Sequence, residues 1–312
     1  MKIAIVSTWN ECCGIAEYTK DLVYGLREKG HSVHVFANFP KLKAEPDEEF
    51  VTRCFHVPYL DNIHETDISF VEQLLQYDIV HFQFETSLYH PAWFPNLVKE
   101  LFGKVPIVFT MHSSGIWPNF DQGFVSRYIT HEPMPWYSNS AVIPMGIKFY
   151  DNTTVGNPKY IVSFGLGRNN DDFVRKAITG TEIEFYTTYG HHKWLSKQDL
   201  VKEIQRAFSV SLIYPPVGAS VSSSAANLAL GCHRVLFCSP TNWFKHVNHY
   251  PAVYSVDTTE RMKEIITDIA ESNDYQSDLL HEIASRKDYI CNEGRDYDTF
   301  VNRHITVYKN LL

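Results

Sequence analysis

The chain has 312 residues, of which 44% are hydrophobic and 21% charged, and this length fits two domains with separate cores. Abundant apolar and aromatic residues exclude disorder as the dominant state. Six cysteines are too few for a disulfide scaffold, so we expect a reducing, cytoplasmic compartment. No apolar run approaches the ~18–20 residues that span a bilayer. The net charge is −8, with 11 basic and 17 acidic residues over positions 1–150, which argues against non-specific nucleic-acid binding.

The first 150 residues alternate short apolar segments with helical ones. In the clearest helix, apolar side chains at positions 15, 18, 22 and 26 share one face, and Gly30 marks its end. The pattern predicts strands at Lys2–Ser7, Ser32–Ala37, Asp78–Gln83 and Pro106–Thr110, and helices at Ile15–Lys29, around Phe70–Gln76 and around Asn96–Phe102. This alternation is typical of parallel sheets built from βαβ units.

A stretch rich in proline and glycine predicts a linker near 148–158, after which the alternation restarts. It predicts strands at Tyr160–Gly165, Glu182–Tyr186, Val210–Ile213 and Arg234–Cys238, and helices at 171–178, 198–208, 222–230, 260–288 and 296–311. The fold class is therefore α/β, with two tandem Rossmann-like domains. Ligands bind beyond the carboxyl ends of strands in such sheets, so two domains facing a cleft would direct their loops into it.

Three loops of the first half follow strands and carry polar candidates. Gly14 lies in a loop before a helix that begins at Ile15, and the free N–H groups of that helix suit an anion or a sugar hydroxyl. Gln83 and Glu85 follow a strand and suit a polyhydroxylated ligand, and His112 follows another, where it could orient a hydroxyl. Each loop also has a structural interpretation that is at least as common on spacing alone. Gly14 would form a tight turn, Gln83 and Glu85 would lie in a solvated loop, and His112 would be a structural histidine.

Two loops of the second half are suited to phosphate. Arg168 lies beside Gly165 and Gly167, and a guanidinium at a glycine-rich turn binds phosphate well. Ser222, Ser223 and Ser224 precede a helix of small residues and would form a diphosphate cradle at its N-terminus. A surface arginine and a plain helix cap are the alternatives. The GxGxxG fingerprint is absent, which disfavours a nicotinamide dehydrogenase.

Taken in order, these loops resemble the GT-B glycosyltransferases of the large retaining family 4 type. The segments that carry the resemblance are CGIAEYTKDL (13–22), EKGHSVHVFA (28–37), YDIVHFQFE (77–85), VPIVFTMHSS (105–114), VIPMGI (142–147), IVSFGLGR (161–168) and AANLALG (225–231). The resemblance implies an acceptor domain over 1–150, a nucleotide-sugar donor domain over 151–295, and a terminal helix over 296–312 that returns to the first domain.

The resemblance also assigns roles to single residues. The donor phosphates would contact Gly14, Arg168, Ser222, Ser223, Ser224 and Ala225. His112 would contact the transferred sugar, and Glu85 would orient or deprotonate the acceptor hydroxyl. Glu17 and Gln83 are the remaining acceptor-binding candidates. The partners expected are a nucleotide sugar and a glycan, lipid-linked or small-molecule acceptor.

Two departures from the family pattern keep alternatives open. The family's Glu-x7-Glu motif falls on Gly218 and Ala226, and no lysine closely follows Arg168. These losses allow a GT-B binding protein without catalysis. A DNA-base glycosyltransferase is a further alternative, against which the acidic first half counts. No Asp-x-Asp follows a strand, since Asp296–Asp298 lies in a predicted helix, so we expect transfer without a metal or other cofactor and, from the family, with retention.

Overall fold

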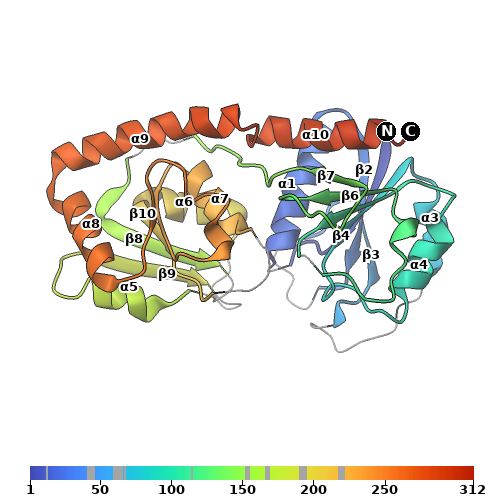
Figure 1. Ribbon diagram of the computed structural model, residues 1–312, viewed down its shortest axis with the longest axis horizontal. Coiled ribbons are helices and arrows are strands. Elements are labelled where there is room, and N and C mark those ends of the chain that lie inside the picture. The colour runs from blue at the N-terminus through green and yellow to red at the C-terminus, as the bar shows by residue number, and fades with distance from the viewer. Residues whose placement is uncertain are drawn as a thin grey trace. The chain divides into compact units, whose positions relative to one another are not determined.

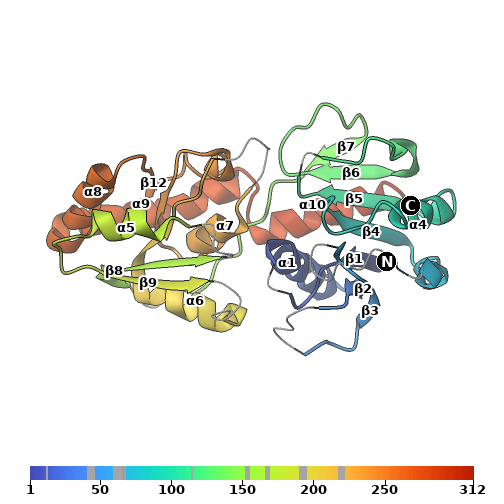
Figure 2. The same cartoon turned by 90° about the horizontal axis from the view of Figure 1, so that it is seen from below.

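The computed structural model describes residues 1–11, 13–40, 46–58, 66, 68–113, 115–151, 155–165, 169–189, 195–216 and 222–312. The chain divides into two compact units, shown in Figures 1 and 2. Unit 1 comprises Met1–Pro144 and Asp298–Leu312, and unit 2 comprises Met145–Tyr297. Among the described residues, no helix combines the length and the apolar character needed to cross a membrane.

Unit 1 is built on a seven-stranded parallel sheet with the order β3-β2-β1-β4-β5-β6-β7. Its strands are β1 (Lys2–Ser7), β2 (Ser32–Asn38), β3 (Val51–Phe55), β4 (Ile79–Phe84), β5 (Ile107–Met111), β6 (Arg127–Thr130) and β7 (Ser140–Val142). The central strands β1, β4 and β5 are buried on both faces, which explains their continuous apolar sequences.

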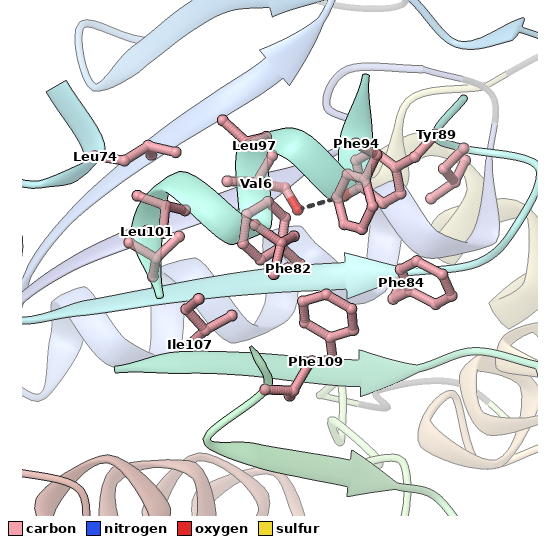
Figure 3. Packing of buried hydrophobic residues seen from close by; sticks show 14 of the residues in the cluster. Val6, Leu74, Phe82, Phe84, Tyr89, Phe94, Leu97, Leu101, Ile107 and Phe109 are labelled. Carbon is pink, nitrogen blue, oxygen red and sulfur yellow. Dashed lines mark hydrogen bonds between the residues drawn. The ribbon is translucent and has the colours of Figure 1, made fainter. Parts of the chain in front are cut away.

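An aromatic core covers one face of this sheet (Figure 3). Phe82 and Phe84 of β4 and Phe109 of β5 pack with Phe94 of α4 (Phe94–Leu101), with ring centroids 5.1–5.7 Å apart. The Tyr89 hydroxyl donates to a β1 carbonyl at 2.9 Å, the dashed line in Figure 3. The short helix α3 (Val71–Leu74) contributes to the same cluster.

Two helices cover the opposite face of the sheet in unit 1. They are α1 (Gly14–Glu28) and α10 (Tyr297–Lys309), of which residues 298 onward belong to this unit. Since side chains alternate along a strand, the neighbours of the core phenylalanines, His81 and Gln83 on β4, face these helices. That face therefore carries polar side chains in a fully buried layer.

Unit 2 has a five-stranded parallel sheet with the order β12-β11-β10-β8-β9. Its strands are β8 (Asn157–Gly165), β9 (Glu184–Tyr189), β10 (Ala207–Leu212), β11 (Val235–Cys238) and β12 (Val253–Ser255). Its helices are α5 (Asp171–Ala177), α6 (Lys197–Arg206), α7 (Ser224–Gly231), α8 (Thr259–Glu271) and α9 (Asn273–Asn292). Helices α6 and α7 join the apolar cluster on one face, while α5 and α8 join that on the other.

The purely parallel α/β sheets confirm the predicted fold class. The compact units divide at 144/145 and 297/298, whereas the sequence placed the divisions at 150/151 and 295/296. The single helical stretch predicted over 260–288 is two helices. Ser272 ends α8 and caps α9, its side chain accepting from the Tyr275 backbone N–H at 3.2 Å.

Candidate active site

The candidate residues of unit 1 gather at the carboxyl edge of its sheet. His112 directly follows β5, Gln83 lies near the end of β4, and Glu85 follows that strand. Strands β1, β4 and β5 are adjacent and parallel, so their ends meet. Gly14 and Glu17 lie in the first turn of α1, which follows β1. The sequence therefore identified loops that the fold brings to one edge.

His112 is partly buried and bound to β4 at two points. Its backbone N–H donates to the Phe84 carbonyl at 2.9 Å, and its Nε2 lies 2.9 Å from Gln83 Oε1. The Tyr18 ring meets the imidazole edge-on, with centroids 4.9 Å apart. Burial, with smaller effects from His131 and another histidine, lowers the pKa of His112 well below its ordinary value. The imidazole is consequently neutral at pH 7.

The sequence interpretation missed a buried polar layer behind His112. His81 is fully buried, with Nδ1 2.6 Å from the Tyr308 hydroxyl and Nε2 2.7 Å from Thr110 Oγ1. His304 is also fully buried, and its Nε2 lies 3.2 Å from the Tyr18 hydroxyl. The sequence did contain a signal for this layer. His81 and Gln83 are two positions apart on an apolar strand and therefore share one face of the sheet. His304 and Tyr308 are four positions apart on a helix and likewise share one face.

Gln83, which the sequence predicts to bind the acceptor, has a buried side chain. Its side chain is 0% exposed, and its amide reaches toward His112 at one end and His81 at the other. In this structure Gln83 therefore contacts other residues of unit 1 rather than solvent, and a direct contact with an acceptor would require it to be uncovered.

Two carboxylates of this edge, Glu85 and Glu17, are partly exposed. Glu85 is half-buried and accepts a hydrogen bond from Ser87 Oγ at 2.7 Å. Its charge adds to burial in raising the pKa of the Cys13 thiol, so the carboxylate lies near the start of α1. Glu17 lies 3.9 Å from the Lys20 ammonium. The edge thus offers acidic groups where hydroxyls could bind.

Arg53 of β3, which the sequence interpretation did not single out, anchors the loop after β1. Its guanidinium donates to the Trp9 carbonyl at 3.0 Å and also to the Asn38 carbonyl, and it forms an ion pair with Asp47. Asn10 in this loop has a left-handed backbone, with φ of 50°. Arg53 thereby ties the carboxyl ends of β1 and β2 together.

The candidate residues of unit 2 lie at the start of α7, after β10. Ser223 is the N-cap, and its hydroxyl accepts from the Ala226 N–H at 3.3 Å. Ser223 is buried, whereas Ser222, Ser224 and Ala225 are partly exposed. The first turn has no acidic residue, so the positive end of the helix is not neutralised locally. Arg168 and Gly218 lie outside the described residues.

In the described part of the chain, no group of three or more His, Cys, Asp or Glu side chains is placed to share a metal ion. The Asp296–Asp298 string lies at the start of α10, and Asp298 forms an ion pair with Lys29. Its position on a helix agrees with the sequence interpretation of a solvated face.

Residues 13–141 match the sequence model of Glycosyltransferase Family 4. Solved glycosyltransferase structures match the entire chain. An alpha-glucosyltransferase in complex with UDP and a 13-mer DNA has a TM-score of 0.69 at 10% identity, covering 99% of this chain and 100% of its own. The chain has the GT-B fold, and its residues 13–141 are similar to Glycosyltransferase Family 4.

Two further structures are similar to this chain over its full length. Anabaena Alr3699/HepE in complex with UDP and glucose has a TM-score of 0.66 at 13% identity, covering 100% of both chains. AviGT4, a glycosyltransferase involved in avilamycin A biosynthesis, has a TM-score of 0.62 at 12% identity, covering 100% of this chain and 98% of its own. No curated protein sequence matches the chain.

Proposed function

We propose that this protein is a glycosyltransferase that moves a hexose or pentose from a nucleotide-diphosphate sugar to an acceptor hydroxyl, with unit 2 binding the donor and unit 1 binding the acceptor. The observation that carries the proposal is the family 4 match over 13–141 on a GT-B fold, with the candidate residues at the carboxyl ends of strands. Solved structures of this fold contain UDP, and one contains UDP-glucose. These ligands motivate a nucleotide-sugar donor.

The start of α7 supports the assignment of the donor diphosphate to unit 2. Free backbone N–H groups and the helix dipole favour an anion there. Ser224 and Ala225 are small and partly exposed, which lets a phosphate approach the backbone. We add the Arg168 guanidinium on sequence grounds. Ala226 stands where the family has its second glutamate, and its N–H is already bonded to Ser223, so this site would hold the nucleotide ribose without that carboxylate.

The carboxyl edge of unit 1 supports the remaining roles. His112 would hydrogen-bond the transferred sugar as a neutral imidazole, while Gly14 would let the donor phosphates approach the start of α1. Glu85 would orient the acceptor hydroxyl and take its proton, with Glu17 as a second acceptor contact. Orientation of two substrates and stabilisation of the leaving diphosphate supply the rate enhancement. We propose retention of anomeric configuration and metal-independent transfer, and both follow from the family resemblance and the sequence.

Thermal unfolding with a panel of nucleotides and nucleotide sugars, with NAD as a control, tests the donor site. A ligand at 100 times its Kd stabilises the folded state by ~2.7 kcal/mol. We expect one nucleoside diphosphate to produce this shift, Arg168→Ala to abolish it, and Lys176→Ala, an exposed change on α5, to preserve it. No shift with any nucleotide would refute the donor assignment.

Turnover then separates an enzyme from a binding protein. With the nucleotide sugar that stabilises the chain, we expect release of nucleoside diphosphate, lost in His112→Ala while the thermal shift remains. Tight binding without turnover on any acceptor would favour the alternative of a GT-B binding protein, which the missing Glu-x7-Glu pair motivates. NMR of the product's anomeric proton reads retention directly, and turnover that survives a chelator tests metal independence.

DNA is a second acceptor candidate, because a similar structure contains UDP and DNA. The excess of six acidic residues over positions 1–150 opposes it. Binding of a duplex should weaken steeply with salt if phosphates are contacted, since each contact releases counterions. Weak, salt-insensitive binding would remove this candidate and leave a glycan, lipid-linked or small-molecule acceptor. The described cysteines are all unpaired, and we propose a cytoplasmic location for the reaction.

A further inference from the structure

A row of buried side chains in unit 1 leads from α10 to His112. The Tyr308 hydroxyl lies 2.6 Å from His81 Nδ1, and His81 Nε2 lies 3.4 Å from Gln83 Nε2. The other end of the Gln83 amide, Oε1, lies 2.9 Å from His112 Nε2. Tyr308, His81 and Gln83 are all 0% exposed, so water does not compete for these contacts.

The chemistry of an amide fixes the proton positions along this row. An amide oxygen accepts hydrogen bonds and cannot donate them, so His112 Nε2 must carry the hydrogen that Gln83 Oε1 receives. An amide nitrogen only donates, so His81 Nε2 accepts and its Nδ1–H donates to the Tyr308 oxygen. In this assignment Thr110 Oγ1, which lies 2.7 Å from His81 Nε2, also donates to that nitrogen.

The surroundings of His112 keep its imidazole neutral at pH 7, so the assignment of one tautomer applies at that pH. His131 and Tyr18 face its ring, and His81 lies behind Gln83. Burial lowers the pKa values of His81 and His112 well below the ordinary value. A neutral imidazole has one N–H and one acceptor nitrogen, so selection of the tautomer decides what His112 offers a ligand.

We propose that Gln83, oriented by His81, is a positioning residue that fixes His112 in its Nε2-protonated tautomer and leaves Nδ1 to accept a hydrogen bond from a hydroxyl of the transferred sugar. The inference rests on the proposed function for its second part only. The tautomer itself is a property of the free protein. It also gives Gln83 a role distinct from the acceptor contact that the sequence suggested.

NMR of the protein labelled with 15N-histidine tests the tautomer without any ligand, with His112→Asn to assign the signal. We expect His112 in the wild type to be protonated at Nε2. Gln83→Leu removes the acceptor and should give a mixture of tautomers. Gln83→Glu keeps an acceptor and should restore the Nε2–H form, while raising the pKa of His112 because a carboxylate favours the imidazolium. Gln73→Glu, the same change at an exposed position of α3, should alter neither.

A wild-type His112 protonated at Nδ1 would overturn the proposal even if every variant failed to fold. So would an unchanged tautomer in folded Gln83→Leu. For the sugar contact, we expect Gln83→Leu to lower kcat about tenfold, the value of one hydrogen bond, with little change in the KM for donor. An unchanged kcat would overturn that second part. If no nucleotide sugar binds or reacts, the proposed function fails while the NMR result still decides the role of Gln83.

Discussion

The buried His304 should make the stability of unit 1 depend on pH. Burial lowers the pKa of His304 to about 4, with a smaller effect from His131. Its Nδ1–H donates to the Phe300 carbonyl at 2.9 Å, and its Nε2 accepts from the Tyr18 hydroxyl, so both nitrogens are used by the neutral ring. A second proton would leave a positive charge in a fully buried layer.

The direction in which the free energy of unfolding changes with pH follows from comparing the pKa of His304 in the folded and unfolded chains. The unfolded histidine titrates near 6.5, so below that pH the unfolded state binds more protons, and the free energy of unfolding falls as pH falls from about 6.5 to about 4. A difference of about 2.5 pKa units is worth ~3.4 kcal/mol in full. Between pH 7.5 and 5.5 the loss is ~1.3 kcal/mol. Burial of His81 and His112 lowers their pKa values too and acts in the same direction.

Urea titrations at pH 7.5 and 5.5, followed by hydrogen exchange of unit 1 peptides, measure this loss in the unit concerned. We expect His304→Gln, which cannot titrate, to reduce the difference between the two pH values by ~1.3 kcal/mol, whatever it does to stability at pH 7.5. His281→Gln, exposed on α9 of unit 2, is the matched control. If His304→Gln shows the wild-type pH dependence, the burial argument is refuted.

Three further substitutions, together with one control, test the packing of the two units. Gly231→Ala should destabilise unit 2 by ~1–3 kcal/mol, because a Cβ there would lie 2.1 Å from the Lys148 carbonyl oxygen. Gly115→Ala, where a Cβ meets nothing within 4 Å, should leave the melting temperature unchanged. Phe94→Ala should lower the free energy of unfolding of unit 1 by ~3–5 kcal/mol in a urea titration, since its ring is fully buried among other rings. Ser223→Ala removes the N-cap of α7 and should cost ~1 kcal/mol, read as a lower melting temperature of unit 2 in the absence of ligand.

Strands were predicted correctly where burial on both faces of the sheet gives a continuous apolar sequence. Strand β1 was predicted at its exact bounds, and β4 and β5 to within one residue. The short strands β3, β6, β7 and β12 were missed. Three of them are the edge strands β3, β7 and β12, where partial exposure permits polar residues and removes the signal. Their existence depends on pairing with a neighbouring strand, which sequence periodicity does not report.

The candidate site could likewise be predicted only in part. The loop positions of His112 and Glu85 could be predicted because ligands of parallel sheets bind beyond strand ends. The hydrogen bonds of the buried layer behind His112 could not be predicted, because their partners come from distant parts of the chain. Gln83 and His112 are 29 positions apart, His81 and Tyr308 are 227 apart, and Tyr18 and His304 are 286 apart. Only the folded sheet and its covering helices bring them together.

The return of residues 298–312 to unit 1 has a consequence for synthesis on the ribosome. The buried layer of this unit takes His304 and Tyr308 from residues translated after unit 2, so its second face lacks α10 while unit 2 is being made. Domains usually fold in the order of their synthesis, with the N-terminal one first. Here unit 2 can complete its contacts first, and the unit that begins the chain is the last to close. A ribosome stalled before codon 298 would therefore hold an incomplete first unit.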